Sequence, residues 1–246
     1  MSVGQDSAPA VPLRVLTYNI RSGTDVLGRR RLSEQAAVVR DAEPDVVLLQ
    51  EVASERQAES VARAAGLDHV AFGAARPSAS GGFGNAVLSR FALREVVNSR
   101  LPPGQVPGQA RAVLGVTLAC ETGATRVLTT HFGLLPGEPD AGARAVVQLV
   151  ESLGGPLILG GDLNRPAGWA GCHRALRRVL DDAARSVARA APGPTFPSPT
   201  PLMRLDYVYV RGVSVRGVRV IRSTASDHRP LVADLTLHQS PVQRRE

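Results

Sequence analysis

Polar side chains occur at several points where an apolar segment of this chain stops. The segment LILGGDLN, residues 157–164, passes from an apolar run through two glycines to Asp162 and Asn164. Glycines let the backbone approach a neighbouring group closely, so we expect this acid and this amide to face a shared site. A buried carboxylate is costly unless it is paired or bound to a metal, and the set therefore indicates a metal-and-base site. The other members interrupt or follow apolar segments in the same way: Asn19, Glu51, His131, Asp206, Asp227 and His228.

Each of these residues also has a simpler explanation when it is considered alone. Asn19 fits a turn or bulge, and Glu51 fits a cap for a helix that begins near Ser54. A single histidine such as His131 is more often a core or rim residue, and the GDLN and SDH sequences both resemble turns. Asp206 is harder to explain, because an acid between Leu and Tyr in an apolar strand needs a partner. The occurrence of all of them in one chain favours the shared site.

The composition is that of a globular domain with a substantial core. The chain has 246 residues, of which 43% are hydrophobic. We expect one domain over residues 13–238, a flexible lead-in at 1–12 and a flexible tail at 239–246. No apolar run is long enough to span a membrane, and no signal-peptide pattern opens the chain. Cys120 and Cys172 stand in unrelated segments and form neither a disulfide framework nor a zinc pattern. We therefore expect a cytoplasmic protein, and we expect it to be monomeric.

The chain is basic, but its charge is dispersed. The net charge is +7, and all 29 basic residues are arginines. The planar guanidinium suits phosphate, so an anionic substrate, nucleic acid included, is compatible with this charge. The arginines are scattered, with GRRR at residues 28–31 as the one compact cluster. Aromatic residues make up 4% of the chain, which leaves few stacking platforms for single-stranded nucleic acid.

Helices and strands must position the candidate residues. Ser54 and Gln57 have the spacing of a capping box, and Gly66 fits the end of the same helix. The Pro-rich residues 191–201 cannot form regular structure. Strands alternate with only some helices, which is typical of a layered α/β or α+β domain. The expected strands cover residues 13–20, 45–52, 85–90, 112–119, 125–132, 157–160, 204–210, 213–221 and 231–237, and the expected helices cover 32–43, 54–66, 140–153 and 173–190, the last broken near its double Asp.

Seven motifs follow one another in an order that matches a known superfamily. They are TYNI, PDVVLLQE, GNAVLSR, THFG, GGDLN, TFPSPTPLMRLDYV and SDHRPL, and they span Thr17 to Leu231. The ordered set resembles the endonuclease/exonuclease/phosphatase superfamily, which includes type I deoxyribonucleases, exonuclease III-like repair nucleases, neutral sphingomyelinases and inositol polyphosphate 5-phosphatases. GDLN and SDHRP are the most specific motifs. The resemblance implies an α+β fold, a four-layer sandwich of two mixed β-sheets with helices on the outside.

The resemblance also implies Mg²⁺-dependent hydrolysis of a phosphate ester, with Mn²⁺ as a substitute metal. Glu51 would be the main metal ligand, with Asn19 beside it and Asp227 supporting the metal's water shell. These groups suit Mg²⁺, which prefers oxygen ligands and keeps several waters. His228 would be the general base for the attacking water, and Asp206 would fix its tautomer.

The remaining motif residues would act on the substrate. By the resemblance, Asp162 orients the water or a second metal, and Asn164 donates to the phosphoryl oxygens. His131 binds the phosphoryl group or protonates the leaving group. One feature departs from type I deoxyribonucleases, in which a carboxylate just before the strand equivalent to NAVLSR supports the matching histidine. Residues 70–94 of this chain contain no Asp or Glu.

These observations favour two functions and disfavour two others. The leading prediction is a phosphodiesterase or phosphomonoesterase, and the alternative is a DNA endonuclease or exonuclease of the same superfamily. A sphingomyelinase-like role is disfavoured, because LPPGQVPGQ and PSASGGFG are too polar to contact a membrane. A catalytically silent phosphate-binding or interaction module is also disfavoured, because every motif residue is present.

Overall fold

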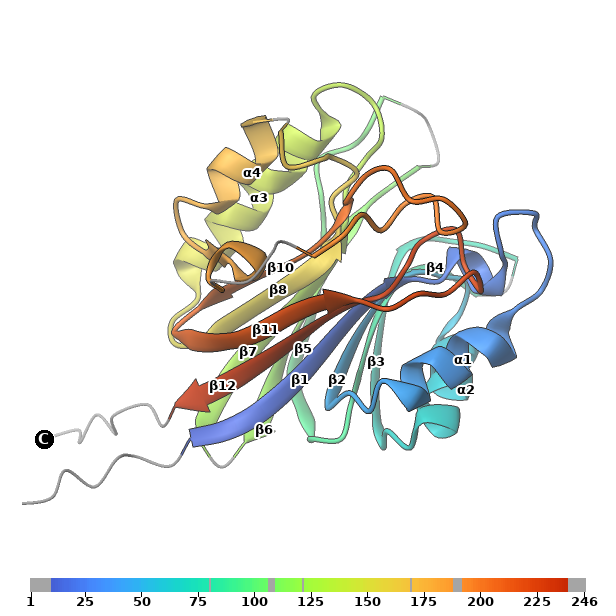
Figure 1. Cartoon of the computed structure of the whole chain (residues 1–246). Helices are drawn as coiled ribbons and strands as arrows, with labels where there is room; N and C mark the ends of the chain where they lie inside the picture. The colour runs from blue at the N-terminus through green and yellow to red at the C-terminus, as the bar shows by residue number, and fades with distance from the viewer. Residues whose placement is uncertain are drawn as a thin grey trace, which may run out of the picture.

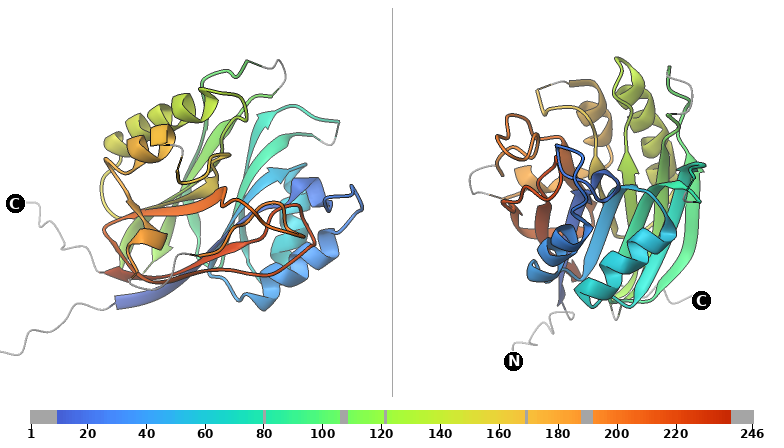
Figure 2. Two further views of the ribbon diagram at one scale, coloured as in Figure 1. Left: turned by 45° about the horizontal axis from the view of Figure 1, so that its top comes forward. Right: turned by 90° about the vertical axis from the view of Figure 1, so that its right-hand side faces the viewer.

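Two six-stranded β-sheets stack face to face and carry helices on their outer faces (Figure 1). The computed structural model describes residues 10–79, 81–105, 109–120, 122–168, 170–187 and 192–238. The predicted four-layer α+β sandwich is confirmed. Two of the four α-helices, α1 (Leu32–Asp41) and α2 (Glu55–Ala65), lie against the first sheet, and α3 (Glu138–Ser152) and α4 (Ala170–Leu176) lie against the second (Figure 2).

Both sheets mix parallel and antiparallel pairs. The first sheet has the order β11-β12-β1-β2-β4-β3, and the second has the order β5-β6-β7-β8-β10-β9. The first contains β1 (Ala10–Asn19), β2 (Val46–Val52), β3 (His69–Arg76), β4 (Phe83–Ser89), β11 (Val213–Val220) and β12 (Leu231–His238). The second contains β5 (Leu93–Arg100), β6 (Ala112–Cys120), β7 (Gly123–His131), β8 (Leu157–Asp162), β9 (Asp181–Asp182) and β10 (Asp206–Arg211).

The central strands are apolar on both faces because both faces are covered. On β1, Val15 packs between the sheets, whereas its neighbours Leu16 and Tyr18 pack under the helices of the first sheet. Successive side chains of a strand point to opposite faces, so a strand covered on both sides reads as a continuous apolar run. This explains why VLTYNI and VVLLQE contain so few polar residues, and why those few are informative.

The helix α2 has the predicted ends. Ser54 Oγ accepts a hydrogen bond from the backbone N–H of Gln57 at 3.2 Å, which satisfies one of the free donors of the first turn. Gly66 closes the helix with a φ of +69°, a conformation that favours glycine.

Several predicted elements differ from the observed ones. The helix predicted over 173–190 is wrong: α4 ends at Leu176, and a short strand and a 3-10 helix (Ala183–Arg185) follow. The side chain of Asp182 accepts from the backbone N–H of Ala184 at 3.0 Å, and Asp182 pairs with Tyr209 in the sheet, so the chain turns at the double Asp. Residues 188–190 of that prediction lie outside the described part.

Besides the short β9, the strands β3 and β5 were not predicted, and β1 is among the strands that begin earlier than expected. Both β3 and β5 lie at sheet edges, and most side chains of β5 are exposed, which removes the apolar alternation that marks a strand. β1 begins at Ala10 rather than Leu13, because Ala10 pairs with His238 of β12. The rest of the expected lead-in, residues 1–9, and the expected tail, residues 239–246, lie outside the described residues. Within the described ranges, no helix has the length and apolar character needed to cross a bilayer.

The register of the strands brings the candidate residues to one end of the sandwich. In the first sheet Asn19 pairs with Gln50, next to Glu51. In the second sheet Asp162 pairs with both of its neighbours, His131 on β7 and Asp206 on β10. The carboxyl ends of the parallel pairs β1–β2 and β7–β8 therefore carry these side chains toward the same rim.

Candidate active site

The two glycines of LILGGDLN allow β8 to approach both neighbours closely. A Cβ on Gly161 would lie 2.0 Å from the carbonyl oxygen of Thr130, and one on Gly160 would lie 2.5 Å from Leu48 Cδ1. Thr130 belongs to the adjacent strand, and Leu48 belongs to the opposite sheet. The close approach places Asp162 at the seam between the sheets, fully buried.

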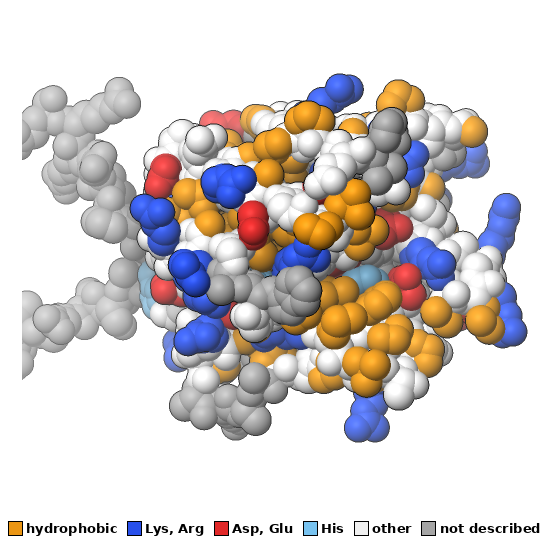
Figure 3. All heavy atoms as spheres, turned by 90° about the horizontal axis from the view of Figure 1, so that it is seen from above, with side chains coloured by type: hydrophobic (Ala, Val, Ile, Leu, Met, Phe, Trp, Pro, Cys, Tyr) orange, Lys and Arg blue, Asp and Glu red, His pale blue; other side chains and the backbone are white. Residues whose placement is uncertain are grey.

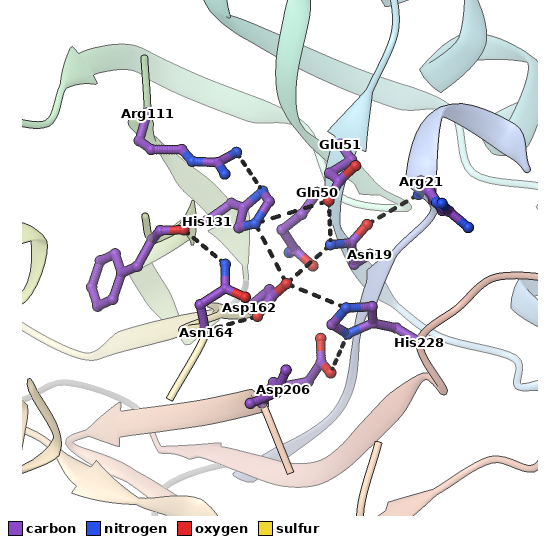
Figure 4. A network of polar contacts seen from close by, with 12 residues as sticks. Asn19, Arg21, Gln50, Glu51, Arg111, His131, Asp162, Asn164, Asp206 and His228 are labelled. Carbon is purple, nitrogen blue, oxygen red and sulfur yellow. Dashed lines mark hydrogen bonds and ion pairs between the residues drawn. The ribbon is translucent and has the colours of Figure 1, made fainter. Parts of the chain in front are cut away.

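Asn19 connects the two sheets at this seam. Its Nδ2 donates to Glu51 Oε1 at 3.0 Å and to Asp162 Oδ2 at 3.0 Å (Figure 4). Its Oδ1 accepts from the backbone N–H of Arg21 at 3.0 Å. One amide therefore holds a carboxylate of the first sheet and a carboxylate of the second in a common position.

Glu51 has an unusual backbone conformation. Its φ is +54°, and the pairing of β2 with β4 shifts register between Leu49 and Val52. Residues other than glycine adopt this left-handed region at a cost, and they do so most often at functional sites. The result is that the Glu51 side chain, 27% exposed, opens toward the cavity instead of continuing the strand alternation.

His228 forms a buried pair with Asp206. The Nδ1 of His228 lies 2.8 Å from Asp206 Oδ2, and its Nε2 lies 3.5 Å from Asp162 Oδ2. Burial lowers the pKa of His228, but the charges on Asp206 and Asp162 outweigh this and raise it to about 10. With Asp206 holding Nδ1, the nitrogen left to act in the cavity is Nε2. The other oxygen of Asp206, Oδ1, is buried without a hydrogen-bond partner among the described residues.

His131 has the opposite electrostatic surroundings. The Nη1 of Arg111 lies 3.1 Å from His131 Nδ1. Burial and the positive charges of Arg111 and His228 keep the pKa of His131 well below its usual value, so the ring is neutral. Guanidinium groups only donate, and Nδ1 therefore accepts while the ring proton lies on Nε2. That N–H points to Asp162 Oδ2, at an Nε2 to Oδ2 distance of 3.5 Å.

Arg111 was not among the residues selected from the sequence. The sequence lacks the carboxylate that supports the matching histidine in type I deoxyribonucleases, and here an arginine occupies the contact with His131. Its only signal in the sequence is its position between a Pro/Gly-rich loop and the apolar strand β6.

Asp162 lies between the two imidazoles. Burial, and after it the charge on Asp206, raises the pKa of Asp162 to about 7, although the charge on His228 opposes the shift. Its Oδ1 accepts from the backbone N–H of Asn164 at 2.9 Å. A carboxylate that titrates near neutrality can either accept or donate a proton in a catalytic step.

Asn164 and Asp227 complete the set from opposite sides. Asn164 has a φ of +51° and uses Nδ2 to donate to the carbonyl oxygen of Phe132 at 2.9 Å. Asp227 Oδ1 accepts from Ser226 Oγ at 3.2 Å, and its Oδ2 lies 3.4 Å from Arg21 Nε. Both residues line the same cavity as Glu51.

The cavity has a volume of about 440 Å³ and a mixed lining. Its polar lining includes Glu51, Asp162, Asp227, both imidazoles and Arg111. Figure 3, which looks down on this end of the molecule, shows acidic, histidine and hydrophobic side chains gathered around a hollow. The apolar lining residues are Leu134, Pro166, Phe196, Met203 and Leu205, and the Phe196 ring lies 4.9 Å from that of His228.

The donor set is compatible with a divalent cation. Ligand atoms of Asp162, Asp206 and His228 all lie within 4.8 Å of one another. Two of these atoms, however, already bind each other in the His228–Asp206 hydrogen bond. Mg²⁺ prefers carboxylate, amide and water oxygens, so Glu51 and the acids around it suit this ion better than the imidazole does. Six of the eight residues selected from the sequence therefore line one cavity at the rim between the sheets, and Asn19 and Asp206 contact them through hydrogen bonds.

Comparison with known proteins agrees with this arrangement. The family model described as Endonuclease/Exonuclease/phosphatase family matches residues 16–228. The chain is 30% identical to the uncharacterized protein YbhP of Escherichia coli, over 94% of this chain and 99% of that protein.

Two solved structures have the same fold. An endonuclease/exonuclease/phosphatase from Beutenbergia cavernae is 28% identical, with a TM-score of 0.76 over 94% of this chain and 73% of that one. A mannosyl-6-phosphatase from Bacteroides thetaiotaomicron is 21% identical, with a TM-score of 0.75 over 91% of this chain and 99% of that one. The resemblance seen in the motifs is thus confirmed, and the chain belongs to the endonuclease/exonuclease/phosphatase family.

Proposed function

We propose that this chain is a Mg²⁺-dependent phosphoesterase in which His228 activates the attacking water. Members of this superfamily are generally hydrolases that act on phosphoester bonds. The observation that carries the proposal is the buried His228–Asp206 pair, 2.8 Å apart, which opens on the same cavity as Glu51 and Asp162. An acid that holds one imidazole nitrogen leaves the other free to take a proton from a nucleophile.

The metal would be held on the side of the first sheet. A Mg²⁺ ion bound by Glu51, with Asn19 and Asp227 supporting its water ligands, would polarise a phosphoryl oxygen and neutralise charge on the leaving oxygen. The carboxylate of Glu51 is suited to this role because its backbone conformation turns it out of the strand and into the cavity.

The attacking water would be held on the side of the second sheet. Asp162 Oδ2 lies 3.5 Å from the Nε2 of both His131 and His228, so a water beside it contacts a base and an orienting carboxylate together. Neutral His228 takes the proton of that water on Nε2, and Asp206 stabilises the resulting imidazolium. The negative charges of Asp206 and Asp162 raise the pKa of His228. The ring becomes neutral, and so able to accept a proton, when those charges are compensated.

The substrate's phosphoryl group would meet hydrogen-bond donors opposite the water. His131 offers Nε2–H, since Arg111 fixes the opposite nitrogen as an acceptor, and this N–H would turn from Asp162 Oδ2, 3.5 Å away, to the substrate. Asn164 offers the second hydrogen of its amide, the first being used by the Phe132 carbonyl. Donors that are fixed before the reaction stabilise charge as it develops on the phosphoryl oxygens.

The test is a panel of esters assayed with Mg²⁺ and with a chelator. The panel contains an aryl phosphomonoester, an aryl phosphodiester, inositol phosphates, sphingomyelin, plasmid DNA and abasic duplex DNA. We expect turnover of at least one ester that stops when the metal is removed. Turnover that persists in chelator, or no turnover of any ester with Mg²⁺ or Mn²⁺, would contradict the proposal.

A DNA endonuclease or exonuclease of the same superfamily is the second candidate. The net charge of +7 favours it, because basic surfaces attract nucleic acid. The apolar lining of the cavity and the small number of aromatic residues do not favour a nuclease. Cleavage of plasmid DNA in preference to the small esters would support this candidate.

A further inference from the structure

Arg111 is a cation in the cavity that has no carboxylate in direct contact among the residues the structure describes. It lies immediately before β6, and its Nη1 contacts His131, a neutral ring. Its Nε is buried without a hydrogen-bond partner. No carboxylate among the described residues lies within 4.0 Å of its guanidinium nitrogens, whereas Arg21, at the same rim, faces Asp227 at 3.4 Å.

This arrangement is costly unless an anion completes it. A guanidinium has five donors, and the described contacts of Arg111 use one of them. A charged group withdrawn from water needs a paired charge or hydrogen bonds to offset its lost hydration. The carboxylates of Glu51, Asp162 and Glu138 act on the guanidinium only from beyond 4.0 Å. An anion in direct contact therefore has to come from whatever occupies the cavity.

We infer that Arg111 binds a terminal oxygen of the substrate's phosphoryl group and directs the site to small phosphomonoesters. The inference rests on the proposed phosphoesterase function and names its substrate class. A phosphomonoester carries a charge of about −1.5 to −2 at neutral pH and has three terminal oxygens, all of them strong acceptors. A phosphodiester has a single charge and only two such oxygens.

The number of donors fits the monoester better. Arg111, His131 Nε2–H and the second amide hydrogen of Asn164 come from three separate residues that line the cavity. Of these three donors only Arg111 is charged. Only its interaction is therefore strengthened by the second negative charge of a monoester.

The size and lining of the cavity favour a small substrate over a polymer. A volume of about 440 Å³ lies within the range of small-molecule sites. Part of the cavity lining is apolar, and Leu134 in that part is 56% exposed. Arg165, which also lines the cavity, donates to the carbonyl oxygens of Leu134 and Leu135. The apolar part of the lining suits an uncharged alcohol group.

The decisive experiment compares two esters that share a leaving group. The value of kcat/KM is measured with Mg²⁺ for p-nitrophenyl phosphate and for methyl p-nitrophenyl phosphate, in the wild type and in Arg111→Gln. Loss of one fixed donor to a phosphoryl or oxyanion oxygen typically costs about 10²–10³-fold. We expect a loss of this size for the monoester and less than about tenfold for the diester, which lacks the second charge. Arg63→Gln, which removes a positive charge from the exposed face of α2, serves as the control and should change neither value.

Binding of inorganic phosphate gives a second measurement that does not depend on turnover. By calorimetry with Mg²⁺ present, we expect Arg111→Gln to weaken phosphate binding at least about tenfold, the loss of one charged hydrogen bond. If the wild type turns over no ester but binds phosphate through Arg111, the proposed function fails and the Arg111 assignment stands. Equal loss of both esters, equal phosphate affinity, or a wild type that prefers the diester or plasmid DNA would overturn the assignment.

Arg111→Lys covers the case in which the glutamine variant does not fold. Lysine keeps the charge but not the planar fork, so the monoester should lose activity selectively and by less than in Arg111→Gln. Loss of both esters to the same extent in this variant would likewise overturn the assignment.

Discussion

The two histidines of the cavity both contact Asp162, but their other partners carry opposite charges. Each places Nε2 3.5 Å from Asp162 Oδ2. The Nδ1 of His228 faces the carboxylate of Asp206, whereas the Nδ1 of His131 faces the guanidinium of Arg111. The pKa of His228 is accordingly raised to about 10, and the pKa of His131 is well below its usual value. The partner behind the ring, rather than burial, decides which imidazole can carry a proton, because both rings are buried.

This difference assigns the two rings to different steps of the proposed reaction. An imidazole with an acid behind it accepts a proton and is stabilised as the cation, as a general base requires. An imidazole with a cation behind it stays neutral and can only donate its Nε2–H. Substitutions of the residues around the two rings should therefore have effects of different size.

In the proposed reaction both rings act on one phosphoryl group next to Glu51. Glu51→Ala should abolish Mg²⁺-dependent turnover and leave the fold intact, because Glu51 is the proposed main metal ligand and its side chain is partly exposed. Turnover is measured with Mg²⁺, and the fold is checked by circular dichroism. Glu59→Ala, which removes an exposed carboxylate from α2, is the matched control. Near-normal rates in Glu51→Ala would refute the metal assignment.

Removing the base should have the next largest effect. His228→Ala should lower kcat by about 10²–10⁴-fold, the usual contribution of a general base. The rate of the wild type should also depend on pH, because only the neutral ring can accept a proton. A wild-type rate that is flat across pH would argue against this role.

Removing the neutral ring of His131 should lower the rate less than removing His228. His131→Ala removes one hydrogen bond to a charged phosphoryl oxygen, which corresponds to about a 10- to 100-fold loss of kcat/KM. The shape of the pH profile should stay that of the wild type, since His131 does not titrate near neutrality. A profile that loses its pH dependence in this variant, and keeps it in His228→Ala, would reverse the assignment of the two rings.

The smallest effect concerns stability rather than rate. A pKa of about 10 in the folded state, against 6.5 in the unfolded chain, means that folded His228 binds a proton throughout this window and the unfolded chain does not. The free energy of unfolding should therefore fall as pH rises from 6.5 to 10, by at most about 1.4 kcal/mol per pH unit from this group. The measurement is denaturant unfolding in chelator across this range.

Asp206→Asn provides the comparison for that slope. It removes the charge that most raises the pKa of His228, so the contribution of His228 to the slope should shrink or vanish. An unchanged slope in Asp206→Asn would show that Asp206 does not set the charge on His228.

Much of the site could be predicted because its members break strong local patterns. Asp206 lies in an apolar strand and needs a partner, and the structure provides His228. The glycines before Asp162 made sense only if another chain segment came close, and Gly161 abuts the carbonyl of Thr130. Such residue types are unusual in the apolar segments around them, and this can be seen in the sequence.

Other features depend on contacts that leave no local trace. Arg111 is one of 29 arginines, and only the path of the chain before β6 places it behind His131. The edge strand β5 keeps most of its side chains in solvent, so its residues carry no apolar alternation. The helix predicted over 173–190 had suitable residues, but α4 ends at Leu176. Asp182 then caps the 3-10 helix and pairs with Tyr209 of β10, so the predicted helix does not resume there.

The amide of Asn19 reaches from a strand of one layer to acids on both layers, and this makes turnover sensitive to how the layers dock. A substitution far from the rim, such as Val15→Ala or Val208→Ala in the interface between the sheets, would let them shift by a fraction of an ångström. Such a shift would loosen the hold on Glu51 and Asp162 while leaving each sheet hydrogen-bonded. Catalysis should thus be lost on heating before the secondary structure melts.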